Sequence, residues 1–313
     1  MTPRSVLLYH PDEAEAYARL MKVPRGSIRL HVCARSEEAA PLIGEAEILY
    51  AWNFPVELLR KANRLRWIQV MGAGVERFLV PELSRSVVVT RAAGIFGPWM
   101  AEYTVAWCAW VTQRMDRIRE QQRARHWVPV MPERLRGKTL AVIGLGDIGR
   151  EVARMGRALG MRVIGVSRRG KKPEWVDRTY RPSALTRALA QSDFAVSVLP
   201  LTPETTGLIG ERELRAMKPT GWILSISRGP VIQEQALLRA LDERWVAGAI
   251  LDVFDTEPLP PEHPLWERQS VVITPHIAGP STAEEIAPIF NDNLARYLRG
   301  QKLRYVVDRK RGY

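Results

Sequence analysis

Cysteine is scarce in this sequence, and long apolar runs are missing. Cys33 and Cys108 are the only cysteines among 313 residues, and both have apolar neighbours, which favours buried thiols in a reducing compartment over a disulfide. No run approaches the roughly 18 apolar residues of a membrane-spanning helix. The N-terminus has a short apolar run followed by acidic residues, unlike a signal peptide. We therefore expect no membrane association and a cytoplasmic location.

Acidic residues are outnumbered by basic ones, 34 against 46, which gives a net charge of +12. Nucleic-acid-binding proteins can have such a charge, but the basic residues here are scattered, with their densest runs at 114–125 and 168–172. The sequence has neither the spacing of zinc ligands nor an RNA-binding aromatic motif. We therefore expect an enzyme with anionic substrates, no metal site and no nucleic-acid partner.

Short strands and helices alternate over the first 95 residues. A length of 313 residues suggests two domains, and the alternation predicts a parallel sheet with helices on its faces. Gly72-Ala73-Gly74 follows the fourth strand, where a turn either presents backbone N–H groups to a ligand or is a plain tight turn. The expected strands are 5–9, 28–32, 48–52, 67–71 and 87–90, and the expected helices are 12–22, 37–44 and 55–62.

A long helix is expected next, over residues 99–125. Tyr103, Trp107 and Trp110 belong to an aromatic stripe with helical spacing. The stripe is typical of a core helix, which we favour, or of a subunit interface.

The next segment has the pattern of a dinucleotide-binding unit. A strand over 140–143 leads into Gly144, Gly146 and Gly149, which have G-x-G-x-x-G spacing, and a helix over 148–159 follows. The glycines allow a tight turn, close approach of the backbone to a pyrophosphate, and close packing of helix on strand. The helix N-terminus adds N–H groups and a positive dipole end.

The same alternation continues and predicts a second doubly wound sheet, so the expected fold class is α/β with two such domains. A last helix, 281–299, is expected to return to the first domain. The further expected strands are 162–166, 194–199, 221–226, 246–253 and 271–274, and the helices are 183–190, 211–217 and 233–243.

Three polar side chains follow strands of the second sheet: Arg228, Glu257 and His276. Because the carboxyl ends of parallel strands share one edge, we expect them beside a bound nicotinamide. A histidine can supply a proton near neutral pH, with a carboxylate behind it. An arginine can hold a substrate carboxylate in a bidentate fork. Taken singly, they could instead be a capped loop histidine, a surface arginine and a solvated acid.

These features resemble the D-isomer-specific 2-hydroxyacid dehydrogenase family along essentially the whole chain. The matching pieces are IGLGDIG, VSVLPLTPETTGLI, SRGPVI, LDVFDTEPLP and ITPHIAG, and the family's Arg, Glu and His fall on Arg228, Glu257 and His276 at intervals of 29 and 19 residues. Ser225 departs from the pattern, because the family mostly has Asn there.

The resemblance implies a flavodoxin-like substrate domain, 1–96 plus 282–313, and a Rossmann cofactor domain, 97–281, with the catalytic cleft between them. It implies that the turn 72–74 and Arg228 bind the substrate carboxylate, that Asp252 binds the nicotinamide amide, and that a homodimer forms around helix 98–125. The implied cofactor contacts are Gly144, Gly146, Asp147, Ile148, Gly149, Leu199, Pro200, Thr205, Ile226, Ser227, Asp252, His276 and Gly279.

Two short motifs, YAWNFP at 50–55 and MAEY at 100–103, are similar to the bacterial glyoxylate/hydroxypyruvate reductase branch. This implies that Trp52 lines the pocket of a small 2-oxoacid; an ordinary half-buried tryptophan is the alternative. Two other functions compete with 2-oxoacid reduction. One is a nicotinamide-sensing binding protein, similar to the family's corepressor branch, and the other is a dehydrogenase of another anion such as phosphite or 3-phosphoglycerate.

The residues after the second strand of the nucleotide unit concern the choice of cofactor. An acid about 20 residues beyond the glycines holds the ribose 2′-OH of NAD, yet the chain has no acid between Glu151 and Glu174. Ser167, Arg168 and Arg169 stand there instead. They can bind a 2′-phosphate, so we expect NADP(H) to be preferred over NAD(H); a solvated basic turn is the alternative.

Overall fold

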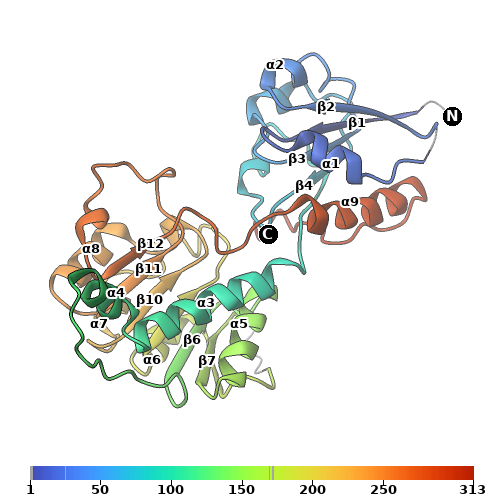
Figure 1. The fold of residues 1–313 in the computed structure, drawn as a ribbon. Coiled ribbons are helices and arrows are strands. Elements are labelled where there is room, and N and C mark those ends of the chain that lie inside the picture. The colour runs from blue at the N-terminus through green and yellow to red at the C-terminus, as the bar shows by residue number, and fades with distance from the viewer. Residues whose placement is uncertain (1–2, 25, 169, 171–172) are drawn as a thin grey trace. The chain divides into compact units, whose positions relative to one another are not determined.

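The structure, a computed structural model, describes residues 3–24, 26–168, 170 and 173–313. The chain divides into two compact units, one made of residues 1–95 and 281–313 and the other of residues 96–280. Figure 1 shows that the C-terminal segment belongs with the N-terminal unit. The domain boundaries expected from the sequence lie one residue from these.

Five parallel strands form the sheet of the first unit, within the residues described, in the order β2-β1-β3-β4-β5. This is the strand order of flavodoxin-like folds. β3 and β4 are buried along their whole length, as expected of parallel strands covered on both faces. The strands are β1 (Arg4–Tyr9), β2 (Ile28–Cys33), β3 (Ile48–Ala51), β4 (Trp67–Val70) and β5 (Val88–Thr90).

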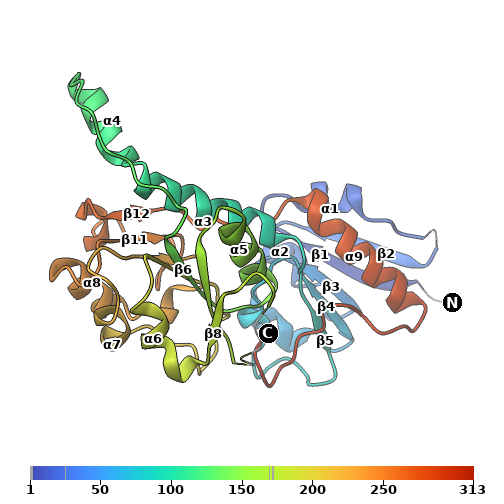
Figure 2. The ribbon, with the colours of Figure 1, turned by 90° about the horizontal axis from the view of Figure 1, so that it is seen from below.

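Aromatic packing explains why the last helix returns to this unit. The Phe290 ring, on α9 (Ala283–Leu298), stacks on Tyr50 with ring centroids 4.1 Å apart and on Trp67 at 5.4 Å. α9 thereby packs on the sheet beside α1 (Ala14–Leu20) (Figures 1 and 2). The unit also contains α2 (Ser36–Ala39) and short 3-10 helices at Val56–Lys61 and Glu76–Phe78.

In the described part of the second unit, seven parallel strands have the order β12-β11-β10-β9-β6-β7-β8. β6 lies between β7 and β9, so the strand order reverses there, and a crevice at the carboxyl ends of β6 and β9 is where such sheets bind nucleotides. The strands are β6 (Thr139–Ile143), β7 (Arg162–Val166), β8 (Arg178–Tyr180), β9 (Phe194–Ser197), β10 (Trp222–Ser225), β11 (Gly248–Leu251) and β12 (Val271–Ile273).

The helices of the second unit are α3 (Phe96–Thr112), α4 (Met115–Ala124), α5 (Asp147–Ala158), α6 (Leu185–Leu189), α7 (Glu211–Arg215) and α8 (Glu234–Asp242), with 3-10 helices at Pro182–Ala184, Gly229–Val231 and Pro264–Glu267. α3 packs against α5. A Cβ on Gly97 would lie only 2.7 Å from Glu151 Cγ, so the two helices approach closely. Among the described residues, no helix is both long and apolar enough to span a membrane.

The single helix expected over 99–125 is wrong. The chain has a left-handed residue at Arg114, φ +54°, which separates α3 from α4. α3 buries seven of its residues, whereas α4 buries none and extends away from the sheet of its own unit (Figure 2). Two smaller differences are that 56–61 is a 3-10 helix and that the three-residue strand β8 was not expected.

Candidate active site

His276 and Glu257 form a hydrogen-bonded pair at the carboxyl edge of the second sheet. His276 lies in the loop after β12 and Glu257 in the loop after β11, with His276 Nδ1 2.8 Å from Glu257 Oε2. Because an ionised carboxylate only accepts, Nδ1 donates and Nε2 is left to face a ligand. Glu257 Oε1 accepts from the Phe254 N–H at 3.0 Å, so both carboxylate oxygens are anchored. The imidazole is 48% exposed and therefore accessible.

Asp252 lies beneath the loop that carries His276. The His276 backbone is left-handed, with φ +54°, a conformation that residues other than glycine adopt rarely. The Asp252 carbonyl accepts from the His276 N–H at 3.0 Å. Its carboxylate accepts from the N–H groups of Ile277 at 2.8 Å and Ala278 at 2.9 Å. Asp252 is 1% exposed. The nicotinamide contact implied for it stays a prediction.

Arg228 follows β10, the neighbour of β11. Its side chain is half-buried, and Nη1 donates to the Ser227 carbonyl at 2.7 Å. A Cβ on Gly229 would lie 2.0 Å from the carbonyl carbon of Phe254. Glycine at this position therefore lets the Arg228 loop pack directly against the start of the Glu257 loop.

The glycine turn joins β6 to α5. Gly144 has φ +108°, and a Cβ there would lie 2.7 Å from the Val198 carbonyl oxygen; at Gly149 a Cβ would lie 1.8 Å from the Gly144 carbonyl oxygen. At Gly146, the N-cap of α5, a Cβ would meet no atom of the described residues within 4 Å. Bare backbone beside the N-terminus of a twelve-residue helix suits a pyrophosphate, so the turn fits a dinucleotide. Asp147 and Ile148 are the first residues of α5.

Loops beyond β9 complete the surroundings of this turn. Leu199 packs against it, since Leu199 Cδ2 would lie 3.1 Å from a Cβ on Gly144. Thr205 Oγ1 donates to the Pro200 carbonyl at 2.7 Å and thus stabilises the loop between them.

Polar groups at the end of β10 are buried beside the same edge. Ser227 Oγ is 3.0 Å from Ser197 Oγ, and Ile226 is buried. Ser225 Oγ is also buried and has no hydrogen-bond partner in the part of the chain that the structure describes. The side chain that departs from the family pattern is therefore also one with an unsatisfied hydroxyl.

Ser167 and Arg168 follow directly after β7. Ser167 N–H donates to the Tyr180 carbonyl at 3.0 Å, and the Arg168 side chain is exposed. The pKa of Glu204 is held below its usual range, first by a hydrogen bond from Thr202 and also by the Arg168 charge. Arg168 thus lies near the loop after β9. Arg169 lies outside the described residues.

In the first unit, Trp52 follows β3 and Gly72 follows β4. A Cβ on Gly72 would lie 2.4 Å from Trp52 Cζ3, so the indole lies directly against this glycine. Asn53 is left-handed, φ +47°, and accepts from Arg77 Nη1 at 3.1 Å. The structure therefore brings Trp52 onto the turn 72–74, in which Ala73 and Gly74 are half-buried.

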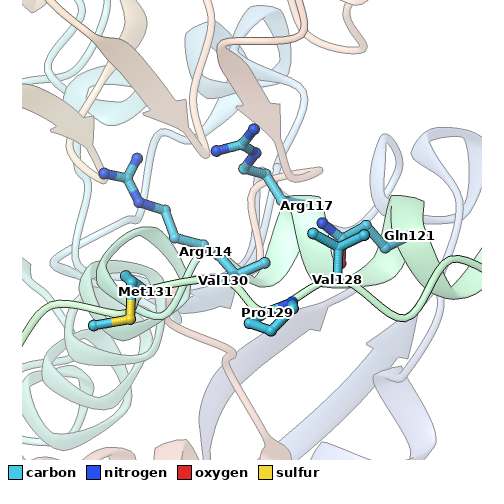
Figure 3. Close-up of a pocket in the computed structure, with 7 residues that line it drawn as sticks. All are labelled: Arg114, Arg117, Gln121, Val128, Pro129, Val130 and Met131. Atoms are coloured by element: carbon cyan, nitrogen blue, oxygen red, sulfur yellow. The ribbon is translucent and has the colours of Figure 1, made fainter.

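A pocket elsewhere in the second unit contains none of the predicted site residues. Figure 3 shows the extended chain at 128–131 running beside α4. Arg117 and Gln121 belong to that helix, and Arg114 is its N-cap. Val128 and Met131 are exposed. No cluster of three or more potential metal ligands occurs in the residues that the structure describes.

Two residues next to the site were not anticipated from the sequence. Thr274 Oγ1 donates to Asp252 Oδ1 at 2.6 Å, and the Tyr103 hydroxyl is 2.6 Å from Thr274 Oγ1. The available signals were a threonine two residues before His276 and a tyrosine within an otherwise apolar helical stripe.

Comparison with known proteins agrees with this geometry. Residues 105–278 match the family model of the D-isomer specific 2-hydroxyacid dehydrogenase NAD binding domain. A glyoxylate reductase of Aeropyrum pernix is 36% identical over 281 residues, which cover 85% of this chain and 84% of that protein.

Solved structures match both units. A D-isomer specific 2-hydroxyacid dehydrogenase family protein of Aeromonas salmonicida has 37% identity and a TM-score of 0.91, covering 98% of this chain and 99% of that one. An NADPH-dependent glyoxylate/hydroxypyruvate reductase of Sinorhizobium meliloti, in complex with NADP and sulfate, has 27% identity and a TM-score of 0.90, covering 99% and 100%. The histidine–carboxylate pair, the glycine turn and these matches together lead to one conclusion: the chain belongs to the D-isomer specific 2-hydroxyacid dehydrogenase family.

Proposed function

We propose that this protein reduces a small 2-oxoacid of the glyoxylate or hydroxypyruvate type to the D-2-hydroxyacid with NAD(P)H. The observation that carries the proposal is the His276–Glu257 pair at the same sheet edge as a glycine turn that fits a dinucleotide. The names of the glyoxylate reductase and glyoxylate/hydroxypyruvate reductase relatives support the substrate class. In this proposal the second unit binds the cofactor, and Trp52 and the turn 72–74 of the first unit bind the substrate.

Each group has a defined task in this reaction. When bound, the nicotinamide would supply the hydride for the carbonyl carbon. His276 Nε2 gives a proton to the carbonyl oxygen. Nδ1 keeps its own proton and donates it in a hydrogen bond to Glu257, which stabilises the imidazolium before transfer. Arg228 holds the substrate carboxylate and polarises the neighbouring carbonyl. Backbone N–H groups of the turn 72–74 are also assigned to the substrate carboxylate in this proposal.

Steady-state assays with glyoxylate, hydroxypyruvate and pyruvate, each with NADPH and NADH, test the activity. His276→Ala should lower kcat by about 10² to 10⁴-fold, because general acid catalysis contributes that much, while cofactor affinity changes little. His126→Ala, at an exposed histidine of the same unit, is the matched control and should keep wild-type rates. Near-normal turnover of His276→Ala would exclude His276 as the proton donor.

NADPH is the preferred cofactor in this proposal. Ser167 and Arg168 follow β7, where an acid would repel a 2′-phosphate, and NADP is bound in the S. meliloti relative. Charge-assisted hydrogen bonds contribute about 1.5–3 kcal/mol each, so two of them favour NADPH by about a hundredfold or more.

Arg168→Ala should reduce the NADPH preference, mainly through KM for NADPH, and added salt should weaken the preference of the wild type. Glu204→Gln is the opposing variant, because it removes the negative charge near Arg168 and should strengthen the preference. Equal kcat/KM for NADPH and NADH in the wild type at low salt would contradict this part of the proposal.

The oligomer in this proposal is a homodimer built around residues 98–125. α4 buries none of its residues within the chain, although Met115 and Ile118 are large apolar side chains and both are more than 40% exposed. The adjoining Trp127 is 99% exposed. Apolar groups exposed in this way typically mark an interface.

A further inference from the structure

Tyr103 is a polar group next to the catalytic loop that the proposed chemistry does not use. It lies on α3, and its hydroxyl is 2.6 Å from Oγ1 of Thr274, the residue that follows β12. Thr274 Oγ1 is in turn 2.6 Å from Asp252 Oδ1. Side-chain hydrogen bonds therefore connect α3 to the residue beneath the His276 loop.

The hydrogen bonds that connect Tyr103, Thr274 and Asp252 can run in only one direction. The Asp252 carboxylate accepts, so the single Thr274 hydroxyl proton points to Asp252. Thr274 can then only accept from Tyr103, and the Tyr103 O–H must donate. Burial raises the pKa of Tyr103 above its usual value, so the phenol keeps the proton that this arrangement needs.

Asp252, the last residue in this series of hydrogen bonds, holds the backbone on both sides of the left-handed His276. The Asp252 carboxylate accepts from the N–H groups of Ile277 and Ala278, and its carbonyl accepts from the His276 N–H. The loop also packs on α3 a second time, since a Cβ on Gly279 would lie 3.1 Å from Met100 Cγ. α3 therefore contacts this loop at a polar point and at an apolar point.

We propose that Tyr103 is a positioning residue for His276, acting through Thr274 and Asp252 to hold the turn that aims the imidazole. The hydroxyl of Tyr103 orients Thr274, Thr274 orients the Asp252 carboxylate, and that carboxylate holds the N–H groups that follow His276. The effect on turnover rests on the proposed function, in which His276 is the proton donor. The effect on the His276 environment does not.

The kinetic test compares Tyr103→Phe, Thr274→Val and Thr274→Ser. Tyr103→Phe removes one oxygen and keeps the ring that packs against Trp107, with centroids 6.1 Å apart. It should lower kcat about tenfold, with KM for both substrates within about twofold, because small misplacements of a reacting group are costly in rate. Thr274→Val should lose at least as much, while Thr274→Ser retains the hydroxyl and should stay within about twofold of the wild type.

The double variant tests whether the residues act in series. Tyr103→Phe combined with Thr274→Val should have the kcat of Thr274→Val alone, since the second substitution already breaks the chain. Tyr297→Phe, which removes a hydroxyl that donates to Glu47 at 2.7 Å in the other unit, is the control and should leave kcat unchanged. Melting temperatures show that each variant is folded.

NMR of histidine Cε1–H groups provides a readout that does not depend on turnover. The chain has five histidines, so the His276 resonance can be assigned from its loss in His276→Asn. Tyr103→Phe should shift the His276 resonance and leave that of His10 in place. Thr274→Ser should keep the wild-type resonance.

The outcomes separate this proposal from the proposed function. A shifted His276 resonance with unchanged kcat would support positioning and contradict the proton-donor role. An unchanged resonance in Tyr103→Phe would overturn the positioning proposal, whatever the kinetics. Additive effects in the double variant would overturn the serial arrangement.

Discussion

At the scale of single residues, Glu257 uses its two oxygens for different partners. Oε2 faces His276 Nδ1 and Oε1 accepts from the Phe254 N–H. An amide in its place has one accepting oxygen, so a glutamine must either turn an N–H toward the imidazole or leave the Phe254 N–H facing a donor. In the first case it disfavours the imidazolium, and in the second it loses the backbone anchor.

Glu257→Gln should therefore reduce the rate of 2-oxoacid reduction more at pH 8 than at pH 6. Without the carboxylate, the imidazolium of the proposed proton donor loses the charge that stabilises it. The measurement is kcat/KM for the 2-oxoacid across this range, with Asp255→Asn in the same loop as the control. A pH profile that matches the wild type would remove Glu257 from proton transfer.

Trp52 is the second residue whose contacts suggest a test. Its indole lies on Gly72, so a substrate held by the turn 72–74 would meet the tryptophan edge. Trp52→Ala should raise KM for glyoxylate several-fold and improve the relative kcat/KM of longer 2-oxoacids. Trp266→Ala, at a half-exposed tryptophan of the other unit, should change neither. The same selectivity in wild type and Trp52→Ala would mean that Trp52 serves packing alone.

At the scale of secondary-structure elements, the start of α1 depends on His10. His10 Nδ1 accepts from the N–H groups of Asp12 at 3.2 Å and Glu13 at 3.0 Å, and the ring stacks on Tyr17. Burial lowers the pKa of this imidazole from its ordinary value of 6.5, although Glu13 and Asp12 oppose the shift. The folded state therefore resists protonation of His10.

Stability should consequently fall as pH drops below 6.5, the ordinary pKa of the imidazole. In that range the unfolded chain takes up a proton that the folded chain does not, until the lower folded pKa is reached; above 6.5 the contribution is complete. His10→Asn offers an accepting oxygen to the same N–H groups without titrating, so its unfolding free energy should lose less between pH 7 and pH 5. His10→Leu should cost about 1 kcal/mol at pH 7. Parallel pH curves for wild type and His10→Asn, from urea unfolding, would contradict this role.

Local patterns made most of the elements predictable. The unit β6–α5–β7 follows from an apolar strand, three glycines and helical spacing, each of which acts within a few residues. The break at Arg114 could not be predicted in this way, because arginine has no preference for the left-handed conformation that it adopts there. The end of the helix at that point depends on the loss of packing beyond α3.

The site was predictable to a similar extent. The order of parallel strands places Arg228, Glu257 and His276 on one edge, and their chemistry makes them candidates for catalysis. Tyr103 gave no comparable signal, because its partner Thr274 is 171 residues away. No sequence pattern pointed to Gly229 either, because its close approach to Phe254 is seen only when both loops are folded.

At the scale of the whole molecule, the exposed apolar side chains of α4 and the segment after it concern assembly. If residues 98–125 form the homodimer, Ile118→Asp should shift the protein toward monomer in sedimentation velocity, because a charge would be buried at the interface. Trp266→Asp, at an exposed apolar residue elsewhere in the same unit, should leave the assembly unchanged. A monomeric wild type, or a dimer that tolerates Ile118→Asp, would contradict this assembly.

The most direct test of the whole account is to follow the reduction of hydroxypyruvate with NADPH deuterated at the transferred position. The account predicts NADPH oxidation, D-glycerate as the product with deuterium at C2, and a rate that falls about 10² to 10⁴-fold in His276→Ala. The absence of turnover with every small 2-oxoacid, an L-product, or a product without deuterium at C2 would contradict it.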